Sequence, residues 1–70
     1  MSESVYRVTE LVGTSTESWE KAAQSAIETA ARTLRDLRLA EVVKLDMTVE
    51  EGKVVRYRTR LNLSFKYESE

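Results

Sequence analysis

The chain has 70 residues, which suffices for one domain and leaves no room for a second, and its formal net charge is −1. It contains no cysteine and no histidine, which excludes disulfide bonds and the commonest zinc and haem sites and leaves oxygen ligands for any metal. A domain this small buries only about 60% of its unfolded surface, so we expect association with further copies of itself to stabilise it.

Charge balance and hydropathy also limit the partners. Lys and Arg number 11 against 12 Asp and Glu, which argues against nucleic acid as a partner. No apolar run is long enough to span a membrane, and no signal peptide opens the chain. We therefore predict a cytoplasmic protein with neither nucleic acid nor membrane partners.

The first predicted element is a strand over Val5–Val12, a segment rich in β-branched and aromatic residues. We expect Gly13 to end it. Thr14 and Glu17 fit a capping box, with Ser15 as a competing cap, and so predict the start of a helix.

That helix is predicted from about Glu17 to Leu37, because apolar side chains recur there every three or four residues. They form one stripe: Trp19, Ala22, Ala23, Ala26, Ile27, Ala30, Ala31, Leu34 and Leu37. Five alanines in the stripe let a covering element approach the helix closely. No other segment has a helical pattern, so the cover must be a sheet.

Two further strands follow, Glu41–Val49 and Lys53–Tyr67, joined by the loop Glu50–Gly52 in which Gly52 takes a positive φ. Alternation in the last strand points its apolar side chains at the helix: Val55, Tyr57, Thr59, Leu61, Leu63, Phe65 and Tyr67. The fold class is thus α+β, a single β-α-β-β domain over residues 1–70, with a three-stranded antiparallel sheet wrapped around one amphipathic helix.

The loop also predicts a register. Pairing Val49 with Lys53 sets Asp46 opposite Arg56 and leaves Arg58 diagonal to Asp46, which favours a structural ion pair on the outer face. The arginines of this strand fit a salt-bridged face, with the phosphate of a nucleotide or of coenzyme A as a second use. Without His or Cys, Ser15 has no evident general base, so we predict that the protein is not an enzyme.

Several segments carry a family resemblance: Val5-Tyr6, the run Glu10–Ser15, the alanine-rich helix, Glu41-Val42 and Phe65-Lys66. Together they resemble dodecin, a family of small flavin-binding proteins that form hollow homododecamers. The resemblance implies a homododecamer that holds a small ligand.

The chain departs from the flavin-binding pattern at the positions that hold the ring. Leu39 stands where those dodecins carry the Trp that stacks on the isoalloxazine, and Arg58 stands where they carry a Gln that hydrogen-bonds it. Asp46-Met47 replaces their usual Arg-Gly. These cofactor positions, Leu39 and Arg58, predict weak binding of FMN, FAD and riboflavin. The alternative is a flavin or coenzyme A storage dodecin with an altered pocket.

The same departures resemble a second branch, the calcium dodecins, in the segment Thr14–Glu20 and in Asp46-Met47. This makes calcium a candidate ligand, and calcium takes six to eight oxygens. The candidate metal ligands are Thr14, Ser15, Glu17, Glu20 and Asp46. The positive end of the helix dipole opposes a cation near Thr14–Glu20, where simple helix capping is the alternative role.

Overall fold

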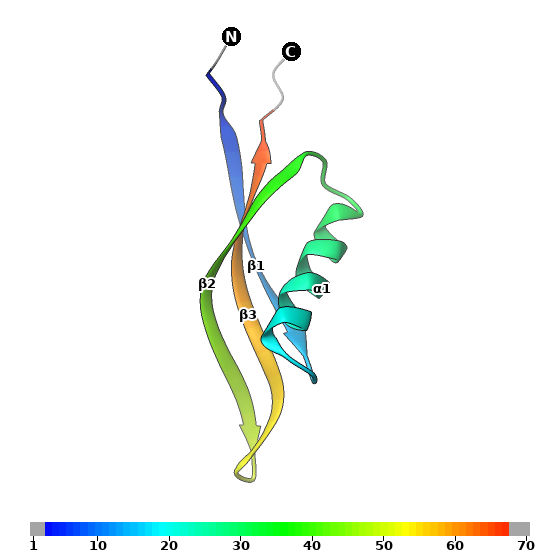
Figure 1. The fold of residues 1–70 in the computed structure, drawn as a ribbon, viewed down its shortest axis with the longest axis vertical. Coiled ribbons are helices and arrows are strands. Elements are labelled where there is room, and N and C mark those ends of the chain that lie inside the picture. Colours follow the sequence, from blue (N-terminus) through cyan, green and yellow to red (C-terminus); the bar gives the residue numbers. More distant parts are fainter. Residues whose placement is uncertain (1–2, 68–70) are drawn as a thin grey trace.

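The computed structural model describes residues 3–67 and has the predicted element order, β-α-β-β. The elements are β1 (Tyr6–Ser15), α1 (Trp19–Ala31), β2 (Leu37–Glu50) and β3 (Lys53–Lys66). Both strand pairs are antiparallel and the sheet order is β1-β3-β2, so β3 is central. Figure 1 shows α1 lying against one face of the sheet, while the β2–β3 hairpin extends beyond it. No helix within residues 3–67 is long and apolar enough to cross a membrane.

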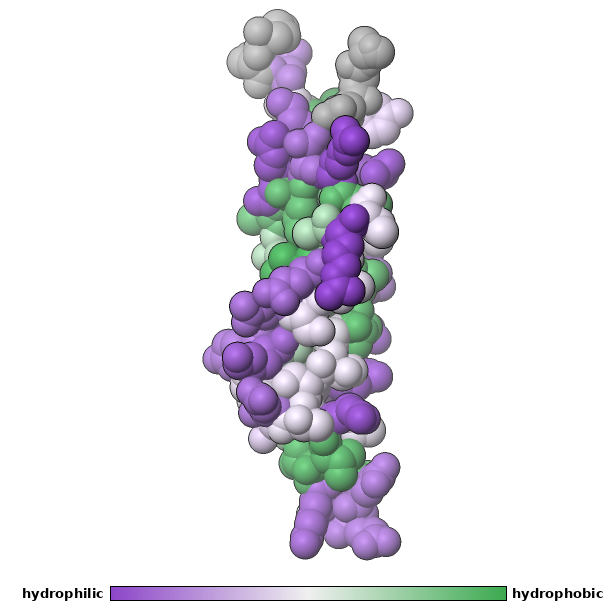
Figure 2. Space-filling model, turned by 90° about the vertical axis from the view of Figure 1, so that its right-hand side faces the viewer, coloured by the Kyte–Doolittle hydropathy of each residue, from purple (hydrophilic) through white to green (hydrophobic). Residues whose placement is uncertain are grey.

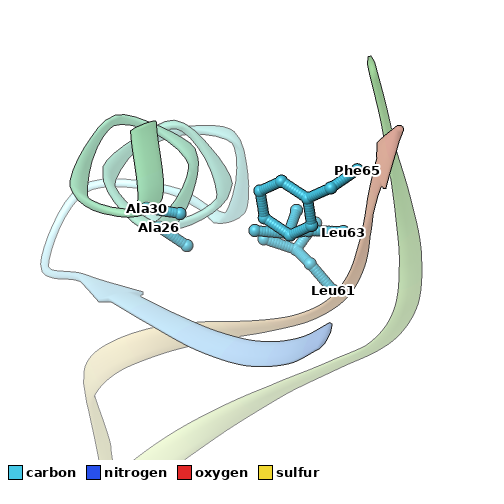
Figure 3. Close-up of a cluster of buried hydrophobic side chains, with 5 residues drawn as sticks. All are labelled: Ala26, Ala30, Leu61, Leu63 and Phe65. Atoms are coloured by element: carbon cyan, nitrogen blue, oxygen red, sulfur yellow. The ribbon is translucent and has the colours of Figure 1, made fainter. Parts of the chain in front are cut away.

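The core lies between α1 and β3, as the alternation in β3 predicted. Its buried members come from both elements: Ala26, Ala30, Leu61, Leu63 and Phe65. Figure 3 shows the three large side chains of β3 pointing toward the two alanines. Leucine and phenylalanine supply the apolar area from the sheet, and alanine lets the helix come close to it.

Gly13 has a different role from the one predicted. It does not end the first strand, because β1 continues to Ser15 and Gly13 pairs with Thr59. A Cβ at Gly13 would overlap the backbone carbonyl oxygen of Ala22 and would lie 3.0 Å from the Cβ of Ala26. The glycine is therefore required for the close approach of α1 to β1.

The predicted helix start at Thr14–Glu17 is wrong. The N-cap is Ser18, whose hydroxyl oxygen accepts from the backbone N–H of Lys21 at 3.0 Å. Ser15 is still in β1, and its hydroxyl oxygen accepts from the backbone N–H of Glu17 at 2.9 Å. Several hydroxyl residues in succession can serve as caps, and β1 continues past the first of them because Thr14 and Ser15 pair with Arg58 and Tyr57 of β3.

The predicted helix end and the start of the second strand are also wrong. The helix ends at Ala31, and β2 begins at Leu37 rather than Glu41. Asp36 takes a φ of 59°, which redirects the chain into β2. Leu34 and Leu37 continue the apolar stripe because they pack against the core from the connection and from β2.

The β2–β3 hairpin has a shorter turn than predicted. Glu50 pairs with Lys53, so the turn consists of Glu51 and Gly52, both with positive φ (52° and 76°). A register irregularity between Thr48 and Val49 then shifts the pairing along β2.

The predicted cross-strand pairs change as a result. Asp46 faces Arg58 rather than Arg56, and Thr48 faces Arg56. An irregularity of this kind adds a residue to one strand, which the alternation of side chains does not indicate.

Much apolar surface remains uncovered within a single chain. Because α1 packs mainly over β1 and β3, apolar side chains on the helix-facing side of β2 are left exposed: Val42, Leu45 and Met47. Leu39 is exposed on the opposite face, and Val43 and Val49 of β2 are exposed as well. Figure 2 shows apolar regions above and below the band that α1 occupies. Contiguous apolar surface of this kind is typical of an interaction face.

Candidate functional site

Asp46 and Arg58 meet directly between β2 and β3, on the sheet face that points away from α1. The Arg58 Nε–H donates to Asp46 Oδ1 at 2.7 Å, and Nη2 donates to Oδ2 at 3.1 Å. Each carboxylate oxygen thus accepts one guanidinium hydrogen bond, a planar contact that orients both groups. The two side chains are each 40% exposed, so the pair is reachable from solvent.

This pair keeps both groups charged. The hydrogen bond from Arg58 lowers the pKa of Asp46 below its ordinary value, partial burial opposes that shift, and the positive charges of Arg58, Lys44 and Arg60 add to it. In return, the hydrogen bond to Asp46 raises the pKa of Arg58. The site therefore presents a carboxylate whose charge an internal cation already balances.

Trp19 connects this pair to the helix. Its indole N–H donates to the backbone carbonyl oxygen of Asp46 at 3.0 Å. The hydroxyl of Thr59 donates to the backbone oxygen of Trp19 at 2.9 Å, and the ring of Tyr57 lies edge-on at 5.2 Å between centroids. Trp19 is thus an anchor that fixes the start of α1 to both β2 and β3.

Leu39 lies in an open hollow of about 440 Å³ with Tyr6, Arg38 and Ser64. It is 62% exposed. Leu39 offers the hollow a flexible apolar side chain and no planar ring, so an aromatic ligand would find area there but no stacking partner.

The two positions that the resemblance predicts to line a flavin pocket are far apart in one chain. Leu39 pairs with Ser64, whereas Arg58 pairs with Asp46. Six residues of extended β3 separate Ser64 from Arg58, a distance of about 20 Å at roughly 3.3 Å per residue. Ser64 and Arg58 lie on the same face because side chains alternate. One small ligand can therefore touch both positions only where two copies of the chain meet.

The five candidate metal ligands fall into two groups on opposite sides of the sheet. Thr14 pairs with Arg58, which pairs with Asp46, so Arg58 lies between these two oxygen donors on the outer face. The other three lie toward the helix start. The Ser15 hydroxyl oxygen accepts a hydrogen bond from the backbone N–H of Glu17. Glu20 lines a hollow of about 270 Å³ beside Trp19.

A single chain does not supply a complete calcium cage. Within residues 3–67, no three acidic side chains come together around a possible metal position. Both oxygens of Asp46 already accept hydrogen bonds from Arg58. Calcium coordination by six to eight oxygens would need donors from more than one copy, and at Asp46 it would need Arg58 to move.

Sequence reasoning missed two features of this site. The direct Asp46–Arg58 pair depended on the two-residue turn and on the extra β3 residue opposite Thr48 and Val49, and the Trp19–Asp46 hydrogen bond joins residues 27 positions apart. The placement of the only Trp at the first position of the helix was the available indication of such an anchor.

Comparison with known proteins agrees with this geometry. The dodecin family model matches residues 5–68. Calcium dodecin from Mycobacterium tuberculosis is 43% identical over 63 residues, which cover 90% of this chain and 89% of that protein. Dodecin from Thermus thermophilus is 42% identical over 64 residues, covering 91% and 93%. The solved structure of dodecin from Streptomyces coelicolor superposes with a TM-score of 0.92 at 38% identity, covering 100% of both chains.

Calcium dodecin and dodecin relatives thus match this chain at similar identity. The family match extends over nearly the whole chain, and the similar structure has the same fold from end to end. The chain therefore belongs to the dodecin family and is a small-ligand-binding protein without enzymatic activity.

Proposed function

We propose that this chain forms a homododecamer that binds a small ligand or ion, with calcium favoured over flavin. The observation that carries the proposal is the two-bond contact of Arg58 with Asp46. It occupies the side chain that the resemblance assigns to the flavin-binding amide position, which is the argument against flavin.

The case against strong flavin binding rests on two side chains. Leu39 provides no ring to stack on an isoalloxazine, and stacking contributes about 0.5–1.5 kcal/mol beyond area burial. Arg58 has only donors, so it cannot accept a hydrogen bond from the flavin ring N–H as a glutamine can. Its guanidinium is also held by Asp46.

The case for assembly rests on exposed apolar surface and on the divided site. Exposed side chains on β2 such as Val42, Leu45 and Met47 need cover. The separation of Leu39 from Arg58 along the sheet means that a shared pocket requires a second copy. A stable monomer of 8.0 kDa in light scattering at micromolar concentration would contradict the dodecamer.

The case for calcium rests on similarity and on oxygen donors. A relative with 43% identity is named calcium dodecin. Asp46 and Thr14 lie on the outer face, and Glu17 and Glu20 lie exposed near the helix start. Symmetric copies could bring such donors together, which one chain does not.

Calorimetric titration of one purified sample with calcium and with riboflavin tests this proposal. We expect saturable calcium binding and no measurable riboflavin binding at micromolar protein. Magnesium serves as the control, since its strict octahedral geometry and slow dehydration disfavour a flexible oxygen site. Riboflavin binding without calcium binding would reject the proposal.

An anionic ligand such as the phosphate of coenzyme A is the second candidate. A hollow of about 490 Å³ near the end of β3 is lined by three cations, Arg7, Arg35 and Lys66, and by one carboxylate, Asp36, among others. Such a cationic lining suits phosphate. Coenzyme A in the same calorimeter tests it: saturable binding that Lys66→Gln weakens would favour this candidate, and the absence of heat would reject it.

A further inference from the structure

We infer that two copies of the chain pack through the outer faces of their sheets, related by a twofold axis that crosses β3 between Arg60 and Asn62. In this arrangement Lys44 of each copy pairs with Glu41 of the other. The arrangement rests on the proposed homododecamer, and it specifies the face and the register through which two copies complete the divided site.

Two neighbouring rows of the outer face carry opposite charges. The first, here called the cationic row, has two cations and no carboxylate, and its members lie side by side across β1, β3 and β2: Val12, Arg60 and Lys44. The second, the acidic row, has two carboxylates and no cation in the same strand order: Glu10, Asn62 and Glu41. The face is therefore self-complementary, because each row matches the other row of a second copy.

These charges are poorly balanced within one chain. Among residues 3–67, neither Lys44 nor Glu41 forms an ion pair, and Arg60 reaches Glu10 only at 3.9 Å. Lys44 pairs directly with Arg60, and like charges in that position destabilise an antiparallel sheet. Lys44, Glu41 and Glu10 are all exposed. Both rows therefore remain open to opposite charges from outside the chain.

A twofold axis brings these opposite charges together. An axis that runs across the strands in the plane of contact reverses the strand direction and sets each strand against its own counterpart. When the axis lies between the two rows, Lys44 faces Glu41 of the second copy and Arg60 faces Asn62, one strand from Glu10. Sheets pack face to face about 10 Å apart, a gap that the long side chains of lysine and glutamate bridge.

Other registers of this contact bring like charges together. An axis on the cationic row sets Arg60 against itself, and an axis on the acidic row sets Glu41 against itself. Moving the axis to the other side of either row sets Arg60 against Arg58 or against Lys66. In the inferred register, like charges meet only at the rim, where the exposed Lys66 faces Arg56 and solvent screens them.

The same axis completes the divided site. Leu39 lies in the row of Ser64, and Asp46 lies in the row of Arg58. Each of these rows is one step beyond a charged row, so the axis sets them against each other. Leu39 then lies opposite Asp46 of the second copy and one strand, about 4.8 Å, from its Arg58. The second copy thus supplies one wall of the candidate site and covers Leu39, which is 62% exposed in one chain.

The test mixes two single variants. Lys44→Glu leaves β2 with a carboxylate in both rows, and Glu41→Lys leaves it with a cation in both. Each variant alone should associate at least about tenfold more weakly than the wild type, because like charges opposed across an interface are strongly unfavourable. An equimolar mixture should regain the wild-type mass in light scattering at micromolar concentration. Contacts within one chain cannot produce that recovery.

The matched control is Lys21→Glu, which makes the same change of charge at an exposed position of α1. It should keep the wild-type mass. Circular dichroism of every variant verifies that the fold is retained, as expected for substitutions of exposed side chains.

Engineered thiols locate the axis by a second route, because the chain contains no cysteine. Asn62→Cys places one thiol of each copy beside the axis, and a short bis-maleimide should join two copies into a covalent dimer. Gln24→Cys lies on α1, on the other side of the sheet, and should remain unlinked under the same conditions.

The outcomes separate this interface from the proposed function. The interface is overturned, and the homododecamer left standing, if both single variants keep the wild-type mass or if their mixture stays as small as its components. An equal loss of mass in Lys21→Glu, or cross-linking of Asn62→Cys no better than that of Gln24→Cys, would also overturn it. A wild-type chain that remains at 8.0 kDa would overturn both.

Discussion

The indole N–H of Trp19 donates a hydrogen bond to the backbone carbonyl oxygen of Asp46 at 3.0 Å. The contact joins the first residue of α1 to the part of β2 that carries the Asp46–Arg58 pair. A side chain near the helix start thus fixes the backbone on which the candidate site is built. A change at Trp19 should therefore affect both the stability of the fold and the geometry of the candidate site.

Trp19→Phe should therefore destabilise the protein. The substitution keeps an aromatic ring beside Tyr57 but leaves the Asp46 carbonyl without its donor, at a cost of about 1 kcal/mol. Urea unfolding at fixed protein concentration measures this cost. Tyr6→Phe, on an exposed strand position, is the control and should lie within about 0.5 kcal/mol of the wild type. Equal midpoints for Trp19→Phe and the wild type would show that the hydrogen bond contributes nothing.

Gly13→Ala should destabilise through crowding. The added methyl group would overlap the carbonyl oxygen of Ala22, which belongs to the helix backbone and cannot turn away. Overpacking of this kind costs typically 1–3 kcal/mol. Thermal unfolding, with circular dichroism to check helix content, is the measurement. An unchanged melting temperature would mean that α1 can move outward at no cost.

Gly52→Val should destabilise for a different reason. No atom lies within 4 Å of an added Cβ at Gly52, so its φ of 76° is the only source of strain. A β-branched residue in that region costs about 1–2 kcal/mol. Glu51→Asn is the opposite control, because asparagine tolerates the φ of 52° at Glu51 better than glutamate does. We expect a lower melting temperature for the first variant and a slightly higher one for the second, and the reverse order would refute the turn assignment.

The Asp46–Arg58 pair should contribute to stability in a pH-dependent way. Arg58 lowers the pKa of Asp46 in the folded protein below the ordinary value of 3.8. The unfolded state therefore binds the proton more tightly, so the contribution is complete above pH 3.8 and is lost as the pH falls through the lowered pKa.

Melting temperatures of the wild type and Asp46→Asn between pH 2 and 7 measure this contribution. The difference between the two proteins should be constant near neutral pH and shrink below about pH 3.8. The melting temperature of Arg58→Gln should depend on pH less steeply than that of the wild type below about pH 3.8, because Asp46 no longer has the partner that lowers its pKa. If it keeps the wild-type dependence, a group other than Arg58 determines the pKa of Asp46.

The fold was predictable because its main patterns are local. Alternation placed Leu61, Leu63 and Phe65 on the buried face of β3, and the alanine stripe indicated close packing with the sheet. The residues at which the helix and strands begin and end were not predictable, because several local hydrogen bonds compete to set them. Ser18 rather than Thr14 caps α1, because Thr14 and Ser15 pair with β3 and belong to β1.

The candidate site was predictable only in part. The resemblance predicts Leu39 and Arg58 as flavin-pocket positions and points to Asp46, and these remain predictions. Their mutual arrangement could not be predicted, since the two-residue turn and the extra β3 residue opposite Thr48 and Val49 each shift the register by one residue and together move the partner of Asp46 from Arg56 to Arg58. The division of the metal candidates between two sheet faces likewise depends on where β1 ends.

A double-mutant cycle on riboflavin binding tests the loss of flavin specificity most directly. Leu39→Trp restores a stacking ring and Arg58→Gln restores an amide that can both donate and accept. Riboflavin is the appropriate probe because it has no phosphate for the arginines to hold. Quenching of its fluorescence on titration gives the affinity of each protein.

We predict that the unmodified protein binds riboflavin weakly. The two substitutions should raise its affinity together by more than the product of their separate effects, because both would contact one ligand. A dissociation constant below about 1 µM for the unmodified protein would contradict the account. It would make flavin the favoured ligand of this dodecin.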